Sequence, residues 1–195
     1  MNGGRLIVEP TEIPDLLVVR VVRHPDERGS FRELFKASDF ADAGLPARIV
    51  QINHSRSARG VVRGLHFQGD PPMAKVMRVA RGHAFFVAVD VRRGSPSCGR
   101  AYWREVAAGD DLWLAAPAGF ARGFQALEDD TEVEYLCTAE YSAAGEGGIR
   151  WDDPALGIPW PMPNAMLSAK DREAPTLAEW LKSPTGGVFA TDSTD

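Results

Sequence analysis

Arg63 and His66 lie three residues apart in the segment RGLHFQ, which is otherwise mostly apolar. A neutral histidine is the natural general base near pH 7, and a guanidinium can stabilise an oxygen that becomes negatively charged. The two residue types therefore suit proton transfer. A lone histidine in a strand is more often a packed core residue, so the pair indicates chemistry only if other reactive groups lie beside it.

The elements around these residues are predicted to be strands. Short β-branched and aromatic runs alternate with frequent Gly and Pro, a pattern typical of an all-β sandwich or barrel. The predicted strands cover residues 16–22, 30–35, 47–55, 60–68, 75–82, 83–93, 111–117 and 131–137. Helices are predicted only at 38–44 and 176–183. The second begins at Thr176 with Glu179 three residues on, which is the pattern of a capping box.

Alternation along the strands predicts which side chains face inward. Glu132 and Glu134 should face water, which turns Tyr135 toward the interior. The same rule places His66 on the face opposite Arg63. If both strands line one barrel, His66 and Tyr135 can meet across its lumen.

Other chemistries have less support in the residue pattern. A zinc, iron or manganese site needs several converging ligands, and the four histidines (His24, His54, His66 and His83) form no HxH pair. No GxSxG motif or glycine-rich phosphate loop occurs in a suitable context. Cys98 and Cys137 show no metal-binding or CxxC spacing, so we expect reduced thiols.

Length and charge narrow the class of protein. The chain has 195 residues, a net charge of −5 and a pI near 5.4, which argues against a nucleic-acid-binding protein. No run of about twenty apolar residues predicts a membrane span, and no signal peptide is evident. We therefore expect a cytoplasmic protein that does not bind membranes. A single domain is predicted over 1–183, followed by a flexible tail over 184–195.

A series of motifs in fixed order resembles the dTDP-4-dehydrorhamnose 3,5-epimerase family, over roughly residues 10 to 180. The family's members act on nucleotide-linked 4-keto-6-deoxy sugars. The resemblance implies a cupin-like jelly-roll β-barrel with short peripheral helices, usually a homodimer, with no metal and no redox cofactor. The motifs are DERGSFRELF (26–35), VQINHSRSARGVVRGLHFQ (50–68), AKVMRVARG (74–82), VAVDVRRGSPSCG (87–99), PAGFARGF (117–124), VEYLCTAEYSAAGEGGIRWDDPALGIPWP (133–161) and LSAKD (167–171).

The resemblance also implies roles for individual residues. His66 would be the general base, Asp171 would orient it, and Tyr135 would deliver a proton to the opposite face of the sugar. Lys75 and Arg63 would hold the 4-keto oxygen as it becomes an enolate. The residues that resemble nucleotide and pyrophosphate contacts are Arg28, Glu33, Gln51 and Asn53.

Two departures from the family pattern bear directly on the pocket. Arg122 stands where a second histidine is expected, and Phe86 stands where an aspartate is usual. The resemblance implies that these two family residues form a second histidine–carboxylate pair, so their joint loss predicts a reshaped pocket. Arg122 is then either a substrate-binding residue of that pocket or a rim residue paired with a phosphate or a nearby carboxylate. The glutamine-glycine usual before the lysine is also replaced, by Met73 and Ala74.

The sequence therefore predicts an epimerase that inverts C3, C5 or both on a sugar nucleotide. The resemblance implies dTDP as the nucleotide, and the departures leave a GDP- or CDP-linked substrate as an alternative. A 3,4-ketoisomerase using the same enediol chemistry is an alternative enzyme. A catalytically inactive sugar-nucleotide-binding module is an alternative from another class of protein.

Overall fold

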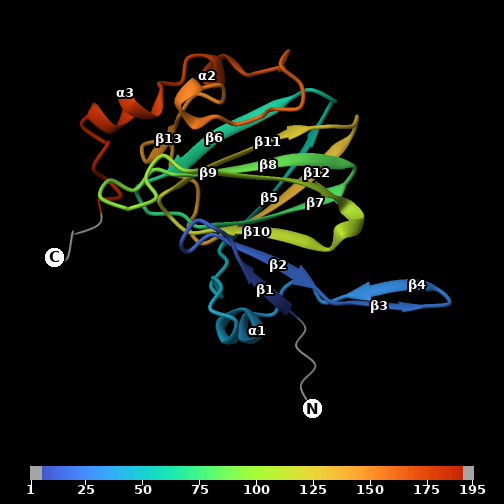
Figure 1. The fold of residues 1–195 in the computed structure, drawn as a ribbon. Coiled ribbons are helices and arrows are strands. Elements are labelled where there is room, and N and C mark those ends of the chain that lie inside the picture. Colours follow the sequence, from blue (N-terminus) through green and yellow to red (C-terminus); the bar gives the residue numbers. More distant parts are fainter. Residues whose placement is uncertain (1–5, 191–195) are drawn as a thin grey trace.

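The fold of the chain is that of two facing antiparallel sheets, seen in a computed structural model that describes residues 6–190 (Figure 1). One sheet has six strands, in the order β1 (Leu6–Pro10), β2 (Leu17–Val21), β10 (Leu112–Ala116), β7 (Lys75–Arg81), β12 (Thr131–Cys137) and β5 (Gln51–Ser57). The other has five strands, in the order β13 (Glu146–Gly148), β6 (Val62–Gln68), β11 (Phe120–Ala126), β8 (His83–Asp90) and β9 (Ala101–Ala107).

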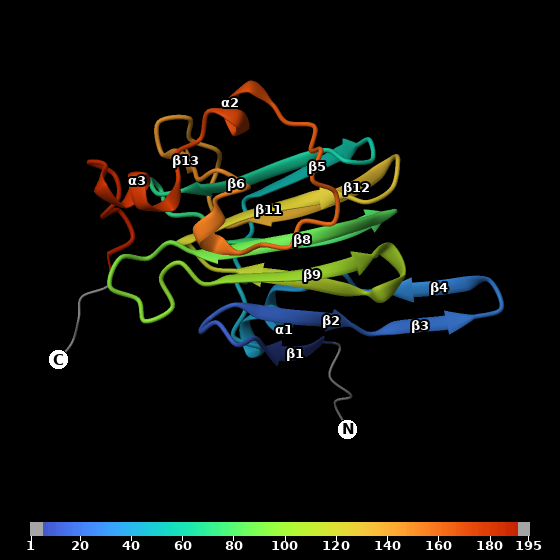
Figure 2. The ribbon, with the colours of Figure 1, turned by 45° about the horizontal axis from the view of Figure 1, so that its top comes forward.

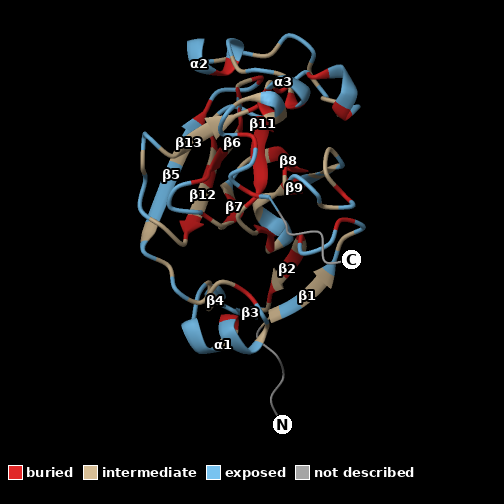
Figure 3. Cartoon of the chain, turned by 90° about the vertical axis from the view of Figure 1, so that its left-hand side faces the viewer, coloured by how far each residue is buried: buried red, intermediate tan, exposed pale blue. Residues whose placement is uncertain are grey.

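Apolar side chains from both sheets fill the space between them. The inward positions of β7, β8, β10 and β11 supply this core, which includes Met77, Phe86, Leu114 and Phe124. Figure 3 shows buried segments gathered where the sheets face each other, and exposed residues along the outer surfaces. Since the core occupies one part of the interior, polar side chains can line the remainder.

Helices and an extended arm lie at the periphery. The helices are α1 (Ala37–Asp42), α2 (Ala169–Arg172) and α3 (Leu177–Lys182), with 3₁₀ turns η1 (Ala108–Asp110) and η2 (Pro154–Leu156). The arm is a hairpin of β3 (Arg23–Asp26) and β4 (Gly29–Arg32), which projects from the body (Figure 2). Segment 149–190 passes over the outer face of the five-stranded sheet, where Trp180 and Phe189 pack on Phe67.

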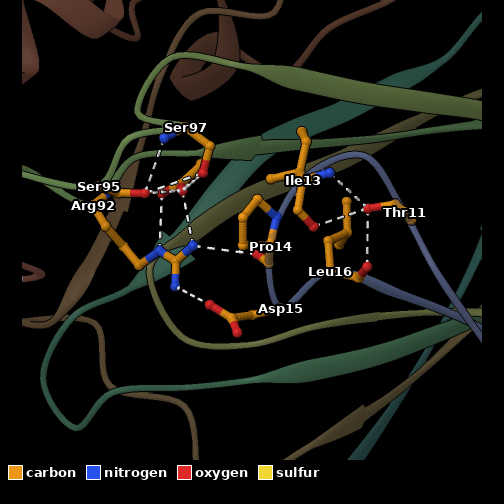
Figure 4. A network of polar contacts seen from close by, with 9 residues as sticks. Thr11, Ile13, Pro14, Asp15, Leu16, Arg92, Ser95 and Ser97 are labelled. Carbon is orange, nitrogen blue, oxygen red and sulfur yellow. Dashed lines mark hydrogen bonds and ion pairs between the residues drawn. The ribbon is translucent and has the colours of Figure 1, made fainter.

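An ionic network around the buried Asp90 ties the loop after β8 to the loop between β1 and β2 (Figure 4). Arg92 donates to the Asp90 carboxylate and to Asp15, and Ser95 and Ser97 also donate to Asp90. Burial by itself would raise the pKa of Asp90, but the hydrogen bonds from Arg92 and Ser97 outweigh it and the pKa is lowered. This network stabilises the VDVRRGSP segment.

The prediction of an all-β, jelly-roll-like fold with short helices is confirmed, although the strands form two separate sheets and no single closed barrel. Helices form at both predicted places, and Thr176 and Glu179 make the predicted capping box. In the segment predicted to be a flexible tail, Phe189 is buried and residues 184–190 lie against the body, while 191–195 fall outside the described residues. Among residues 6–190, no helix is long and apolar enough to cross a membrane.

Candidate active site

A cavity of about 420 Å³ opens between the two sheets, beside the apolar core. Strands β6 and β11 of the five-stranded sheet form one wall, and β5, β7 and β12 of the six-stranded sheet form the other. Its polar lining consists of Asn53, His54, Ser55, Arg63, His66, Lys75, Arg122, Tyr135, Ser168 and Asp171. Seven of the residues that the sequence singled out therefore share one cavity.

His66 and Asp171 form a directly hydrogen-bonded pair, with 2.5 Å between His66 Nε2 and Asp171 Oδ1. The side chain of Asp171 is only 5 % exposed and that of His66 is 30 % exposed. Burial by itself would raise the pKa of Asp171, but the hydrogen bond and charge of His66, together with hydrogen bonds from Ser168 and the Gly64 backbone, outweigh it, so the pKa is lowered. The carboxylate stays ionised and holds Nε2, which leaves Nδ1 of His66 as the nitrogen free to accept a proton.

Local structure places Asp171 over the strand that carries His66. Ser168 is the N-cap of α2, and its hydroxyl accepts a hydrogen bond from the backbone N–H of Asp171. The short helix packs against β6. The cap therefore fixes the position of Asp171, which lies 105 residues from His66 in the sequence.

A bulge in β6 brings Arg63 and His66 to the same cavity, which corrects the prediction that they occupy opposite faces. In the pairing of β6 with β11, Arg122 lies opposite His66 and Phe124 lies opposite Arg63. Three residues along β6 therefore correspond to two along β11, which is the geometry of a β-bulge. Gly64 permits this because its φ is +135° and a Cβ there would lie 2.7 Å from Gly123 Cα. The guanidinium of Arg63 donates to the Ser57 hydroxyl.

Tyr135 lines the opposite wall, as alternation along its strand predicts. Its hydroxyl lies 3.1 Å from the Ser55 hydroxyl. Burial raises the pKa of Tyr135 to about 12, and the Ser55 hydrogen bond opposes this only in part. The phenol is therefore protonated at neutral pH and can donate a proton into the cavity.

Lys75 and Arg122 bring two cations to the site. Burial first, and the charge of Arg122 second, lower the pKa of Lys75 below its ordinary value. Lys75 Nζ lies 5.8 Å from the centre of the Tyr135 ring. The ammonium is thus close to the side chain that could supply a proton.

Arg122 is a buried residue of the cavity wall, so the interpretation of it as a rim residue is wrong. Arg122 is only 3 % exposed, and its Nη2 donates a hydrogen bond to the Met73 carbonyl at 2.5 Å. Among the described residues, no carboxylate pairs with it. Phe86, where an aspartate was expected, is fully buried on the same sheet face and packs edge-on against Phe124.

The predicted nucleotide contacts lie in two different places. Asn53 lines the cavity, and Gln51 donates to its side-chain oxygen at 2.8 Å. Arg28 lies at the turn of the β3–β4 arm, where it pairs with Asp26, and Glu33 follows β4 directly. Neither Arg28 nor Glu33 lines the cavity of its own chain.

Three polar residues of the site were not singled out from the sequence. Ser55 and His54 follow Asn53 along β5, and Ser168 begins α2. Ser168 had a detectable signal, because Ser-x-x-Asp in LSAKD has the spacing of a helix N-cap. Ser55 lies two residues from Asn53 and therefore shares its strand face. Among residues 6–190 no cluster of three or more His, Cys, Asp or Glu side chains forms a metal site.

The motif order, the fold and this cavity agree with the comparisons to known proteins. The family model described as dTDP-4-dehydrorhamnose 3,5-epimerase matches residues 10–179. The chain belongs to this family. A dTDP-4-dehydrorhamnose 3,5-epimerase of Methanothermobacter thermautotrophicus is 42 % identical over 174 residues, covering 87 % of this chain and 93 % of the relative.

Two solved structures show the same fold with sugar nucleotides bound. A Legionella pneumophila 3,5-epimerase in complex with dTDP-4-keto-L-rhamnose has a TM-score of 0.85 and 36 % identity, covering 89 % of this chain and 93 % of the other. ChmJ, a 3'-monoepimerase from Streptomyces bikiniensis in complex with dTDP-quinovose, has a TM-score of 0.85 and 36 % identity, covering 93 % and 92 %. The comparisons confirm the predicted family and support an isomerase of the epimerase type over a ketoisomerase or an inactive binding module.

Proposed function

We propose that this chain inverts C3, C5 or both in a dTDP-linked 4-keto-6-deoxyhexose. The observation that carries the proposal is that the His66–Asp171 pair and Tyr135 lie on opposite walls of one cavity. Inversion at carbon requires a base on one face of the sugar and an acid on the other. Within the described residues these are the groups that supply both.

The reaction begins at a carbon next to the ketone. His66 Nδ1 removes the proton, and the electrons of the broken C–H bond move onto the ketone oxygen to form an enolate. Asp171 stabilises the imidazolium that results. Lys75 and Arg63 hold the enolate oxygen, since both line the cavity with positive charge. Tyr135 then donates its phenolic proton from the opposite face, and the stereocentre inverts.

Proton exchange in D2O tests the proposal. The protein is incubated with dTDP-4-keto-6-deoxyglucose, and the C3 and C5 protons are followed by NMR. Exchange at both carbons is expected of a 3,5-epimerase, and exchange at one carbon identifies a single-site epimerase. Both kinds of enzyme occur among the similar structures. Exchange at neither carbon would overturn the proposal.

We also infer that the active form is a homodimer. Phe31 on the arm is 66 % exposed, and Ile52 on β5, the edge strand of the six-stranded sheet, is 68 % exposed. Exposed large apolar side chains at a sheet edge and on a projecting arm suit a contact with a second copy. In such a pair, the arm of one chain could bring Arg28 and Glu33 to the cavity of the other.

Sedimentation velocity tests the dimer with the Ile52→Asp and Phe31→Asp variants. Each should shift the protein toward monomer, while Trp103→Asp, which alters an exposed aromatic residue on the other sheet, should leave the dimer intact. A wild-type protein that sediments as a monomer across the micromolar range would contradict the inference.

A further inference from the structure

Arg122 presents an unusual electrostatic situation inside the cavity. The residue is 3 % exposed, and its only hydrogen bond among the described residues runs from Nη2 to the Met73 carbonyl. Nε and Nη1 are buried without a partner. Buried charges in proteins are normally paired because desolvation of an unpaired charge is costly. A guanidinium left in this state indicates that its partner arrives with the ligand.

The charges around Arg122 make the cavity positive. Lys75 is the second cation, and it lies close enough for Arg122 to affect its protonation. The one buried carboxylate of the lining, Asp171, already accepts the hydrogen bond from His66. Phe86 fills a nearby position on the same sheet face with an aromatic ring, and the carboxylate that β8 does carry, Asp90, accepts hydrogen bonds from Arg92, Ser95 and Ser97. The cavity therefore favours a ligand atom that carries negative charge.

The position of Arg122 identifies which ligand atom this is. Its register partner across the β6–β11 pair is His66, so the backbone of Arg122 lies beside that of the base, and both side chains line the cavity. The sugar ring is neutral until His66 removes a proton, and the negative charge then appears on the ketone oxygen. A permanent anion such as a pyrophosphate would better suit an exposed cation than a guanidinium on a residue that is only 3 % exposed.

We infer that Arg122 is a further catalytic residue, which contacts the enolate oxygen together with Lys75. The inference rests on the proposed function. The Met73 carbonyl holds Nη2 and orients the group before substrate binds, while Nε and Nη1 remain available to donate. A donor that is fixed in advance and left unsatisfied in the free enzyme stabilises charge that develops during the reaction more than it stabilises the neutral substrate.

The first test separates turnover from binding in Arg122→Met, which keeps much of the length of the side chain and removes its charge and donors. We expect kcat to fall by about 10²–10³-fold, the loss typical of one oxyanion donor, with the Kd for dTDP unchanged. Arg122→Lys, which keeps the charge, should recover part of this loss. Arg150→Met, the same change at a half-exposed arginine outside the cavity, should leave kcat within a few-fold of wild type. Unchanged kcat in Arg122→Met, or a raised KM with kcat retained, would overturn the inference.

The second test measures thermal stability without substrate. If Arg122 is an uncompensated buried charge, Arg122→Met should raise Tm by roughly 2–8 °C even as kcat falls. A residue held for structural reasons would lower Tm instead, and that result would overturn the inference. Arg150→Met serves again as the control, since it removes a guanidinium that is half-exposed and paired with Asp152.

Failure of the inference can be told apart from failure of the proposed function. If the wild-type enzyme exchanges a ring proton and Arg122→Met exchanges it equally fast, only the role of Arg122 is wrong. If the wild-type enzyme exchanges neither the C3 nor the C5 proton, the proposed function is wrong and the enolate contact is refuted with it. A slow Arg122→Met variant with a raised Tm supports both.

Discussion

Replacing Asp171 by Asn should leave the shape of the site intact and remove most of its activity. The carboxylate accepts a hydrogen bond from His66 Nε2 at 2.5 Å and is almost completely buried. An amide can still accept that hydrogen bond through its carbonyl oxygen. It carries no charge, however, so it cannot stabilise the imidazolium that forms when His66 takes a proton.

The size of the loss follows from the geometry of this pair. Two unit charges at this separation interact by roughly 6 kcal/mol if the effective dielectric constant is about 20. The His66 side chain is 30 % exposed, so water screens part of this energy, and the amide keeps one hydrogen bond. A net loss of about 3–4 kcal/mol remains, which corresponds to roughly 10²–10³-fold in kcat.

Single-turnover exchange of the C3 and C5 protons in D2O measures this loss. Asp152→Asn is the matched control, because Asp152 is a surface carboxylate paired with Arg150 and lies outside the cavity. The control should exchange at the wild-type rate. If Asp171→Asn also exchanges at that rate while it remains folded, His66 does not depend on a charged partner and the assignment of the base fails.

Three further outcomes follow from the structure. Tyr135→Phe should form the inverted product about 10²-fold more slowly or worse, because it lacks the acid, yet should still exchange protons through His66. Product analysis by NMR would show retention of configuration, and normal inversion would refute the role of Tyr135. Gly64→Ala should destabilise the fold by about 2–4 kcal/mol in urea titrations, because its Cβ would meet Gly123 and its φ is +135°, whereas Gly109→Ala, which meets nothing within 4 Å, should be nearly neutral. The lowered pKa of Asp90 contributes stability that is present above pH about 4 and lost as the pH falls. Asp90→Asn should therefore be less stable at pH 7, and its free energy of unfolding should fall less steeply toward low pH. Equal slopes of the unfolding free energy against pH in the two proteins would contradict this.

The sequence predicted eight of the strands and the inward turn of Tyr135, because both depend on local alternation of apolar and polar residues. It did not predict β1, β3, β9, β13 or β11, which carries Arg122. The same alternation failed for Arg63. The β6 bulge depends on the close approach of Gly64 to Gly123, which lie far apart in the sequence, and no period of two can anticipate such a contact. Local pattern therefore identifies most of the strands, whereas the shared face of Arg63 and His66 results from the packing of β6 on β11.

Local sequence pattern also could not predict hydrogen-bonded pairs of residues that lie far apart in the sequence. Nothing in the segment around His66 indicates Asp171, and only the resemblance to the epimerase family connected them. The structure supplies the physical reason, since the Ser168 cap orients α2 so that the carboxylate lies over β6. The capping pattern itself was visible in the sequence, but the strand against which the helix would pack was not.

The two departures from the family pattern are best understood as one electrostatic change. Phe86 extends the apolar core with a ring packed on Phe124, and so removes a carboxylate from the face that carries Arg122. With an acidic neighbour, a guanidinium would be neutralised in the resting enzyme and would contribute little as charge develops. Without one, it stays unpaired beside Lys75, and the cost of burying it is recovered only when an anion forms in the cavity. The aromatic residue at position 86 is therefore part of what would make Arg122 useful in the reaction.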